Sequence, residues 1–161
     1  MIIEDDTKQT LKFIAWLIAI IVVLYFSFLL IFYKASSPVR NETRELNQIV
    51  LQKSPIKRIE RNYHLDRGVN SYSAKGIAKN SQTYYFIYLP ASKKAYLLSS
   101  KKGVSETAVR NKYGTKYPDD KITAVNLGWY RNKAVWEVAA KNSSGDYHYK
   151  LYEFKNGNLL G

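Results

Sequence analysis

Hydrophobic and polar positions divide the chain into one long apolar block and a longer region of alternating pattern. Residues 13–33 read FIAWLIAIIVVLYFSFLLIFY and contain no charged side chain. A helix of this length spans roughly 32 Å, close to the ~30 Å hydrocarbon thickness of a bilayer. Because apolar residues surround such a helix on all sides, the block predicts a transmembrane helix rather than a core helix. A cleaved signal peptide is disfavoured, since its apolar run is only about 7–15 residues long.

Two further helices are predicted, each with a narrow apolar stripe. Ser36-Ser37-Pro38 is expected to stop the membrane helix, because proline cannot donate a hydrogen bond inside a helix. The next helix is predicted over about residues 39–52, where Leu46, Ile49 and Val50 form the stripe. Ser105 is a good N-cap for another helix, which is expected to reach about residues 112–113 and to be closed by Gly114.

After each of these helices the apolar period changes to two, which is typical of strands separated by turns. The expected strands cover residues 56–65, 72–79, 83–89 and 95–99, then 122–130, 134–141, 146–154 and 159–160. The segment 83–89, rich in Tyr, Phe and Ile, has the strongest strand pattern. One of its faces must be core, and the other carries either Tyr84 and Tyr88 or Tyr85 and Ile87. That other face is a candidate binding surface, and the simpler interpretation is that its tyrosines cover a half-exposed sheet.

The two halves of this region superpose at an offset of about 62 to 63 residues. Leu46 falls on Val109, Val50 on Tyr113, and Tyr85 on Tyr147. The predicted fold class is therefore α+β, a transmembrane helix followed by two tandem units of one helix packed on an antiparallel sheet. The alternative is a single α+β domain of seven or eight strands.

The net charge of the chain mainly indicates what kind of partner it binds. The formal net charge is +12, and it lies entirely after Lys34, because three acidic and three basic residues cancel up to that point. A basic domain favours anionic partners such as nucleic acid, acidic lipid or the polymers of a cell envelope. Nucleic acid is disfavoured for a domain that faces outward from a membrane.

Catalytic chemistry has little support in the sequence. There is no cysteine, so no disulfide, thiolate nucleophile or zinc–thiolate site can form. The two histidines, His64 and His148, lie in separate predicted strands, and the acidic pair Asp119-Asp120 lies in a turn. No nucleophile motif or phosphate loop is present. We expect no enzyme activity, no metal and no cofactor.

Candidate binding residues come from basic clusters and aromatic side chains. Trp136 is expected in the core, on one face with Val138 and Ala140. A solvated turn is the simpler interpretation of the lysine pairs, and contact with acidic lipids or wall polymers is the functional one. The candidates for a binding surface are Lys93, Lys94, Lys101, Lys102, Tyr84, Tyr88 and Trp129.

The order of parts resembles that of a known family. Residues 85–98, YFIYLPASKKAYLL, followed by Gly103-Val104-Ser105-Glu106, resemble the centre of the TseB (YpmB) proteins of Gram-positive bacteria. Residues 135–138 with 147–160 resemble the end of a PepSY-type repeat. The resemblance implies a cytoplasmic tail (1–12), a membrane helix (13–33), a linker (34–40) and two cystatin-like, PepSY-like domains (41–102 and 103–161).

The same resemblance implies a function and a location. It indicates a single-pass membrane protein with an extracytoplasmic C-terminal part, which regulates cell wall (peptidoglycan) elongation through association with a class B penicillin-binding protein. The basic residues flanking the apolar block give a slight count in favour of the opposite orientation. The alternatives are a binding module for an anionic envelope polymer and a PepSY-type protease-inhibitory domain.

Overall fold

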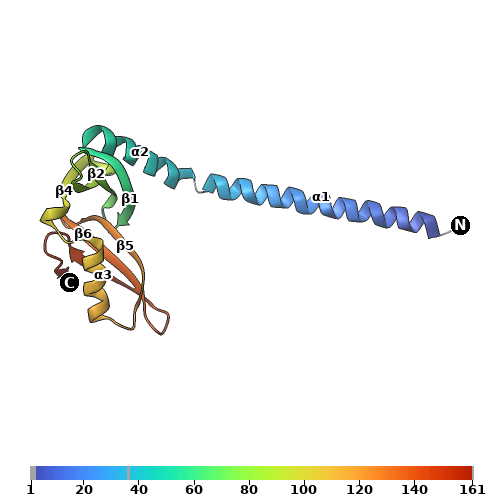
Figure 1. The fold of residues 1–161 in the computed structure, drawn as a ribbon. Helices are drawn as coiled ribbons and strands as arrows, with labels where there is room; N and C mark the ends of the chain where they lie inside the picture. Colours follow the sequence, from blue (N-terminus) through green and yellow to red (C-terminus); the bar gives the residue numbers. More distant parts are fainter. Residues whose placement is uncertain (1–2, 36, 161) are drawn as a thin grey trace. The chain divides into compact units, whose positions relative to one another are not determined.

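The structure is a computed structural model that describes residues 3–35 and 37–160, with side chains described for 9–34 and 42–160 (Figure 1). It divides into two compact units, Met1–Glu42 and Thr43–Gly161. Within the described residues the fold is α+β, with an N-terminal apolar helix and two four-stranded antiparallel sheets.

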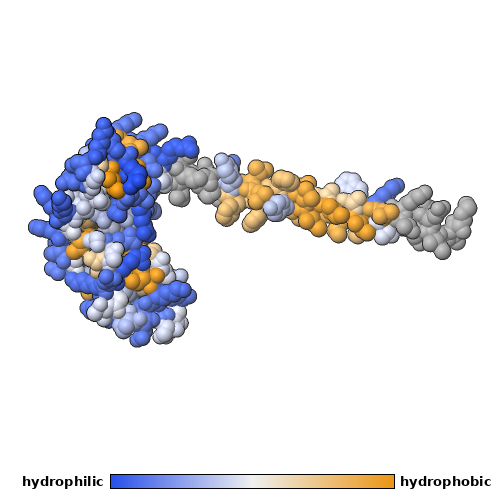
Figure 2. All heavy atoms as spheres, viewed as in Figure 1, coloured by the Kyte–Doolittle hydropathy of each residue, from blue (hydrophilic) through white to orange (hydrophobic). Residues whose placement is uncertain are grey.

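The first unit is dominated by α1 (Ile3–Ala35). Among the described residues, Gln9–Lys34 is the one helical stretch long and apolar enough to cross a membrane. Its large apolar side chains from Leu11 to Tyr33 are all at least 43% exposed. Figure 2 shows these apolar residues along the surface of the helix. This exposure is what a lipid-facing helix requires, so α1 is compatible with a membrane anchor.

The first sheet, sheet A, follows α2 (Ser37–Lys53), which begins two residues before its predicted start. Its strands lie in the order of the sequence, and each pairs antiparallel with the next. The predicted strand limits agree with the structure within two residues. The strands are β1 (Ile56–Asp66), β2 (Asn70–Ala78), β3 (Thr83–Leu89) and β4 (Lys94–Ser99), with short helices η1 (Pro90–Ser92) and η2 (Ser100–Lys102) on either side of β4.

The second sheet, sheet B, follows α3 (Glu106–Lys116) and repeats this order. The predicted N-cap is confirmed, because the backbone N–H of Ala108 donates to the side chain of Ser105. The strands are β5 (Lys121–Tyr130), β6 (Lys133–Lys141), β7 (Tyr147–Glu153) and β8 (Leu159–Leu160).

The predicted end of the helix at Gly114 is wrong, because α3 continues through this glycine to Lys116. The last turn is held by tertiary contacts of two tyrosines. Tyr113 is fully buried and donates its hydroxyl hydrogen to Asp120 at 2.5 Å. Tyr117 packs against the Tyr113 ring, and its backbone N–H donates to the Tyr113 carbonyl at 2.8 Å. Packing therefore overrides the local preference of glycine for a helix end.

Strand β3 is covered on both faces. Phe86 packs with Leu46 and Val50 of α2, and Tyr84 and Tyr88 lie at the edge of this cluster. Tyr85, Ile87 and Leu89 point to the other face and belong to a larger cluster with α3 and sheet B. The face that carries Tyr84 and Tyr88 is therefore half-exposed, and the opposite face is core.

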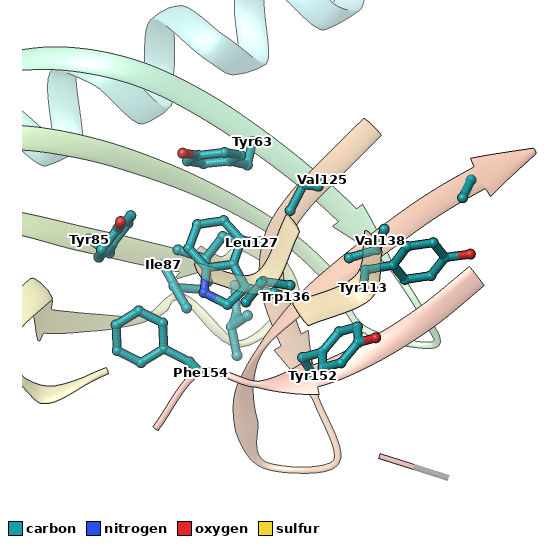
Figure 3. Close-up of a cluster of buried hydrophobic side chains, with 13 residues drawn as sticks. Tyr63, Tyr85, Ile87, Tyr113, Val125, Leu127, Trp136, Val138, Tyr152 and Phe154 are labelled. Atoms are coloured by element: carbon teal, nitrogen blue, oxygen red, sulfur yellow. The ribbon is translucent and has the colours of Figure 1, made fainter. Parts of the chain in front are cut away.

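The larger cluster is centred on Trp136, which is fully buried as predicted, together with Val138 and Ala140. The rings of Tyr63 and Tyr85 from sheet A each meet the Trp136 ring edge to face at 5.5 Å between centroids. Figure 3 shows both tyrosines and Phe154 around the indole. The core of the second half is thus completed by side chains of the first half.

Polar contacts between β2 and β5 fix how the two sheets meet. Ser73 donates its hydroxyl hydrogen to the Leu127 carbonyl at 3.0 Å, and Ser71 accepts from the Trp129 N–H at 3.0 Å. Both serines are fully buried. Because β5 is an edge strand of sheet B, these hydroxyls satisfy backbone groups that would otherwise lack a partner in the interior. We call this contact the sheet A–sheet B joint.

Candidate functional site

A groove lies where the end of β4 approaches sheet B. Its volume is about 360 Å³, and its apolar walls come from Leu97, Leu98, Trp129 and Phe154. The remaining lining residues are Ser99, Lys102, Asn132, Lys133, Ala134, Glu153 and Lys155. We call this depression the β4 groove. It combines an apolar interior with charged groups, as sites for protein segments commonly do.

Aromatic packing holds one wall of the β4 groove in place. The Trp129 ring is stacked on Tyr96, with 3.9 Å between the centroids and 14° between the planes. Its backbone N–H is tied to Ser71 through the sheet A–sheet B joint. Leu97 is 43% exposed although it is a large apolar residue in a strand. The wall is therefore rigid and only partly covered.

Positive charge predominates at the β4 groove, with three lysines against one glutamate. The glutamate is already neutralised, because Glu153 lies 3.3 Å from the ammonium group of Lys133 and accepts a hydrogen bond from Asn156. The hydrogen bond from Lys133 lowers the pKa of Glu153. Among the described residues, Lys102 and Lys155 form no salt bridge, so they remain as the charges available to a ligand.

The structure brings together only two of the candidate binding residues, Lys102 and Trp129, which both line the β4 groove. Lys101 is exposed in the same short helix η2. Lys93 and Lys94 lie at the opposite end of β4, where Lys93 closes a turn with a left-handed backbone (φ 54°). Tyr84 and Tyr88 are half-buried beside the α2 cluster. The predicted residues thus do not form one surface.

Sequence reasoning missed Leu97, Phe154 and Lys155 as parts of a site. The signal for the first was the pair Leu97-Leu98, because consecutive apolar residues in a strand place one on each face. No local signal joins these leucines to Phe154 and Lys155, which come from the end of the chain. Only the packing of sheet A against sheet B creates that proximity.

A second, more polar pocket of about 460 Å³ lies between β1 and the start of α3. Its central residue is Glu106, which contacts Arg61 at 3.0 Å, Arg110 at 2.9 Å and the hydroxyl of Tyr63 at 3.1 Å. Burial raises the pKa of Tyr63, and the charge of Glu106 raises it further. Tyr63 therefore stays neutral and donates to Glu106, which links the two halves of the unit.

The histidines have structural partners. His64 is stacked on Tyr72 with 4.6 Å between centroids, and its Nε2 lies 2.7 Å from Asn70 Oδ1. His148 Nδ1 lies 3.7 Å from Asp120, the carboxylate that also accepts from Tyr113. Within the side chains that the structure describes, no three His, Cys, Asp or Glu residues are grouped as metal ligands are.

Comparisons with known proteins identify a similar fold. The structure resembles that of the YpmB protein from Bacillus subtilis, with a TM-score of 0.62 and 20% sequence identity. The match covers 71% of this chain and 91% of the other. No protein-family model matches the chain, and no curated protein matches it either. The chain therefore has a YpmB-like fold. At 20% sequence identity this match shows the fold alone.

Proposed function

From the YpmB-like fold we propose that the chain is a non-enzymatic, membrane-tethered interaction module. The observation that carries this proposal is the attachment of that fold to a helix whose apolar side chains are exposed on every side. A tether of this kind limits a partner to the same membrane or the layer beside it. We place the folded unit outside the cytoplasm, as the resemblance to the TseB (YpmB) family implies.

We further propose that the folded unit consists of two tandem cystatin-like repeats. This is supported by the repeated order of one helix and one four-stranded sheet. The equivalent helix positions Leu46 and Val109, and likewise Val50 and Tyr113, are all buried. The equivalence ends at Tyr85 and Tyr147, since Tyr85 is buried in the core and Tyr147 is 56% exposed. The repeats thus share a fold, but equivalent strand positions in the two repeats differ in burial.

The proposed role is regulation of cell wall elongation by association with a class B penicillin-binding protein. Its support is the resemblance of residues 85–98, 103–106, 135–138, 147–154 and 157–160 to the TseB (YpmB) family, together with the similar fold. The enzyme activity at such a complex would belong to the synthase, while this chain would bind and position it.

In-cell crosslinking tests this role. A photo-crosslinking amino acid is placed at Leu97 or Tyr147, two exposed positions on different sheets, in the full chain expressed in a Gram-positive bacterium. We expect light-dependent adducts with a class B penicillin-binding protein, identified by mass spectrometry, from at least one position. Unirradiated cells are the control. Recovery of no cell wall synthase from either position would contradict the proposed function.

Orientation is tested with single cysteines, because the natural chain contains none. Ser144→Cys lies in the exposed turn between β6 and β7, after the apolar stretch in the sequence. Gln9→Cys lies at the N-terminal end of that stretch. We expect a membrane-impermeant maleimide to label Ser144→Cys in intact cells and Gln9→Cys only after the membrane is permeabilised. The reverse pattern would place the folded unit in the cytoplasm.

An anionic envelope polymer is the second candidate partner. It is favoured by the net charge of +12 and by the exposure of Lys93, Lys94, Lys101 and Lys102. Binding of the full chain to isolated cell walls would then weaken steeply as salt rises, because the attraction between exposed charges is screened. Protease inhibition is a further alternative from the PepSY resemblance, and it is assayed by adding the chain to candidate proteases.

A further inference from the structure

We propose that the β4 groove binds an extended, acidic segment of a partner protein, which adds a strand to sheet A alongside β4. This inference rests on the proposed function as an interaction module and specifies the surface and the ligand. The segment carries an apolar side chain that enters the groove and carboxylates on either side of it.

The first support is the position of β4 in its sheet. In the part of the chain that the structure describes, β4 pairs with β3 and with no other strand, so it forms an edge of sheet A. An edge strand presents backbone N–H and C=O groups that an extended peptide can pair with. The other three edge strands offer less, because β8 has only two residues and because β1 and β5 pack against each other where the two sheets meet.

The second support is that the groove follows this edge. Leu97 is opposite Phe86 and Leu98 is opposite Tyr85 in the pairing of β3 with β4, so their side chains point to opposite faces of sheet A. Both nevertheless line the groove. Because β4 is an edge strand, the groove lies beside the Leu97–Ser99 end of that edge. A segment lying there would meet the backbone of β4 and the side chains of Trp129 and Phe154 together.

The third support is charge, which determines the chemistry of the occupant. Lys102 and Lys155 line the groove, while Lys133 is already paired with Glu153. A carboxylate next to the inserted apolar side chain would meet these lysines. A second copy of β4 is a poor occupant, since the strand reads KAYLLS and has no carboxylate to meet Lys102 and Lys155. A phosphate-rich wall polymer lacks the peptide backbone that pairs with a strand edge.

Peptide binding to the full chain in detergent micelles tests this inference. The probes are fluorescent peptides that alternate glutamate with valine, leucine or tyrosine, and the controls carry lysine in place of glutamate. We expect the acidic peptides to bind and the lysine peptides not to bind. We also expect binding to slow hydrogen exchange at backbone amides of residues 95–98, because a new strand covers the outer edge of β4.

Charge reversal identifies the lysines that recognise the ligand. The double variant Lys102→Glu/Lys155→Glu is expected to weaken binding roughly tenfold. The matched control Lys57→Glu/Lys121→Glu makes the same charge change at exposed positions away from the groove, and it should retain nearly full affinity. Circular dichroism establishes that both variants keep the fold.

Each outcome has a defined meaning. Failure of all the acidic peptides to bind, or binding without protection of residues 95–98, would overturn the inference; the second result would be expected of an anionic polymer site. Equal loss of affinity in both double variants would also overturn it. These results leave the proposed function standing if crosslinking from Tyr147 captures the synthase. Failure of crosslinking at both positions would instead remove the proposed function itself.

Discussion

Replacing Trp136 by alanine is expected to lower the free energy of unfolding by about 3–5 kcal/mol, the usual loss for a large aromatic core residue. Trp136 is fully buried, and its indole Nε1–H donates to the Val104 carbonyl at 2.9 Å. The substitution removes this hydrogen bond and leaves a cavity between Tyr63, Tyr85 and Phe154. Denaturant unfolding of the full chain, followed by circular dichroism, measures the effect.

The matched control is Trp129→Ala. This indole is half-buried at the β4 groove, at the edge of the core cluster, and is stacked on Tyr96. Its removal leaves a gap open to solvent, so we expect a clearly smaller loss of unfolding free energy than at Trp136. Equal losses for the two variants would show that Trp136 is not the centre of the shared core.

Replacing Gly128 by alanine is expected to disturb the sheet A–sheet B joint and to cost about 1–3 kcal/mol of unfolding free energy, the usual range for overpacking. An added Cβ would overlap with the Cβ of Leu65 and would lie 2.6 Å from Oγ of Ser71. Neither neighbour has room to move, because both are buried. We therefore expect faster hydrogen exchange at the Trp129 amide, which donates to Ser71.

Gly114→Ala is the control with the opposite expected sign. An added Cβ at this position meets no atom within 4 Å, and the residue lies inside α3. Alanine in a helix interior is favoured over glycine by roughly 0.5–1 kcal/mol, so this variant should be more stable than the natural chain. The prediction for Gly128 fails if Gly128→Ala is as stable as the natural chain or more stable.

The sequence was sufficient for most elements of the fold because the local signals agreed with one another. Alternation, turn residues and the Ser105 cap placed the strands and the start of α3 close to where they lie. The helix end at Gly114 was misplaced because its last turn depends on Tyr113 reaching Asp120, a contact that no window of sequence reveals.

The relation between the two halves was the part that local patterns could not provide. The continuous apolar run of β3 is typical of a strand covered on both faces, whereas alternation alone predicts only that one face is core. What covers the second face is Trp136 and its neighbours, about fifty residues further along the chain. The β4 groove arises from the same packing, so its residues could not be grouped in advance.

The packing of β3 on both faces also has a consequence for how the chain is made. Synthesis runs from the N-terminus, so sheet A is complete before β5 to β7 exist. During that interval Tyr85, Ile87 and Leu89 have no covering partner, although α2 is already available for the opposite face. If the folded unit is exported as a growing chain, the uncovered face of sheet A is the surface that a chaperone at the membrane would have to shield.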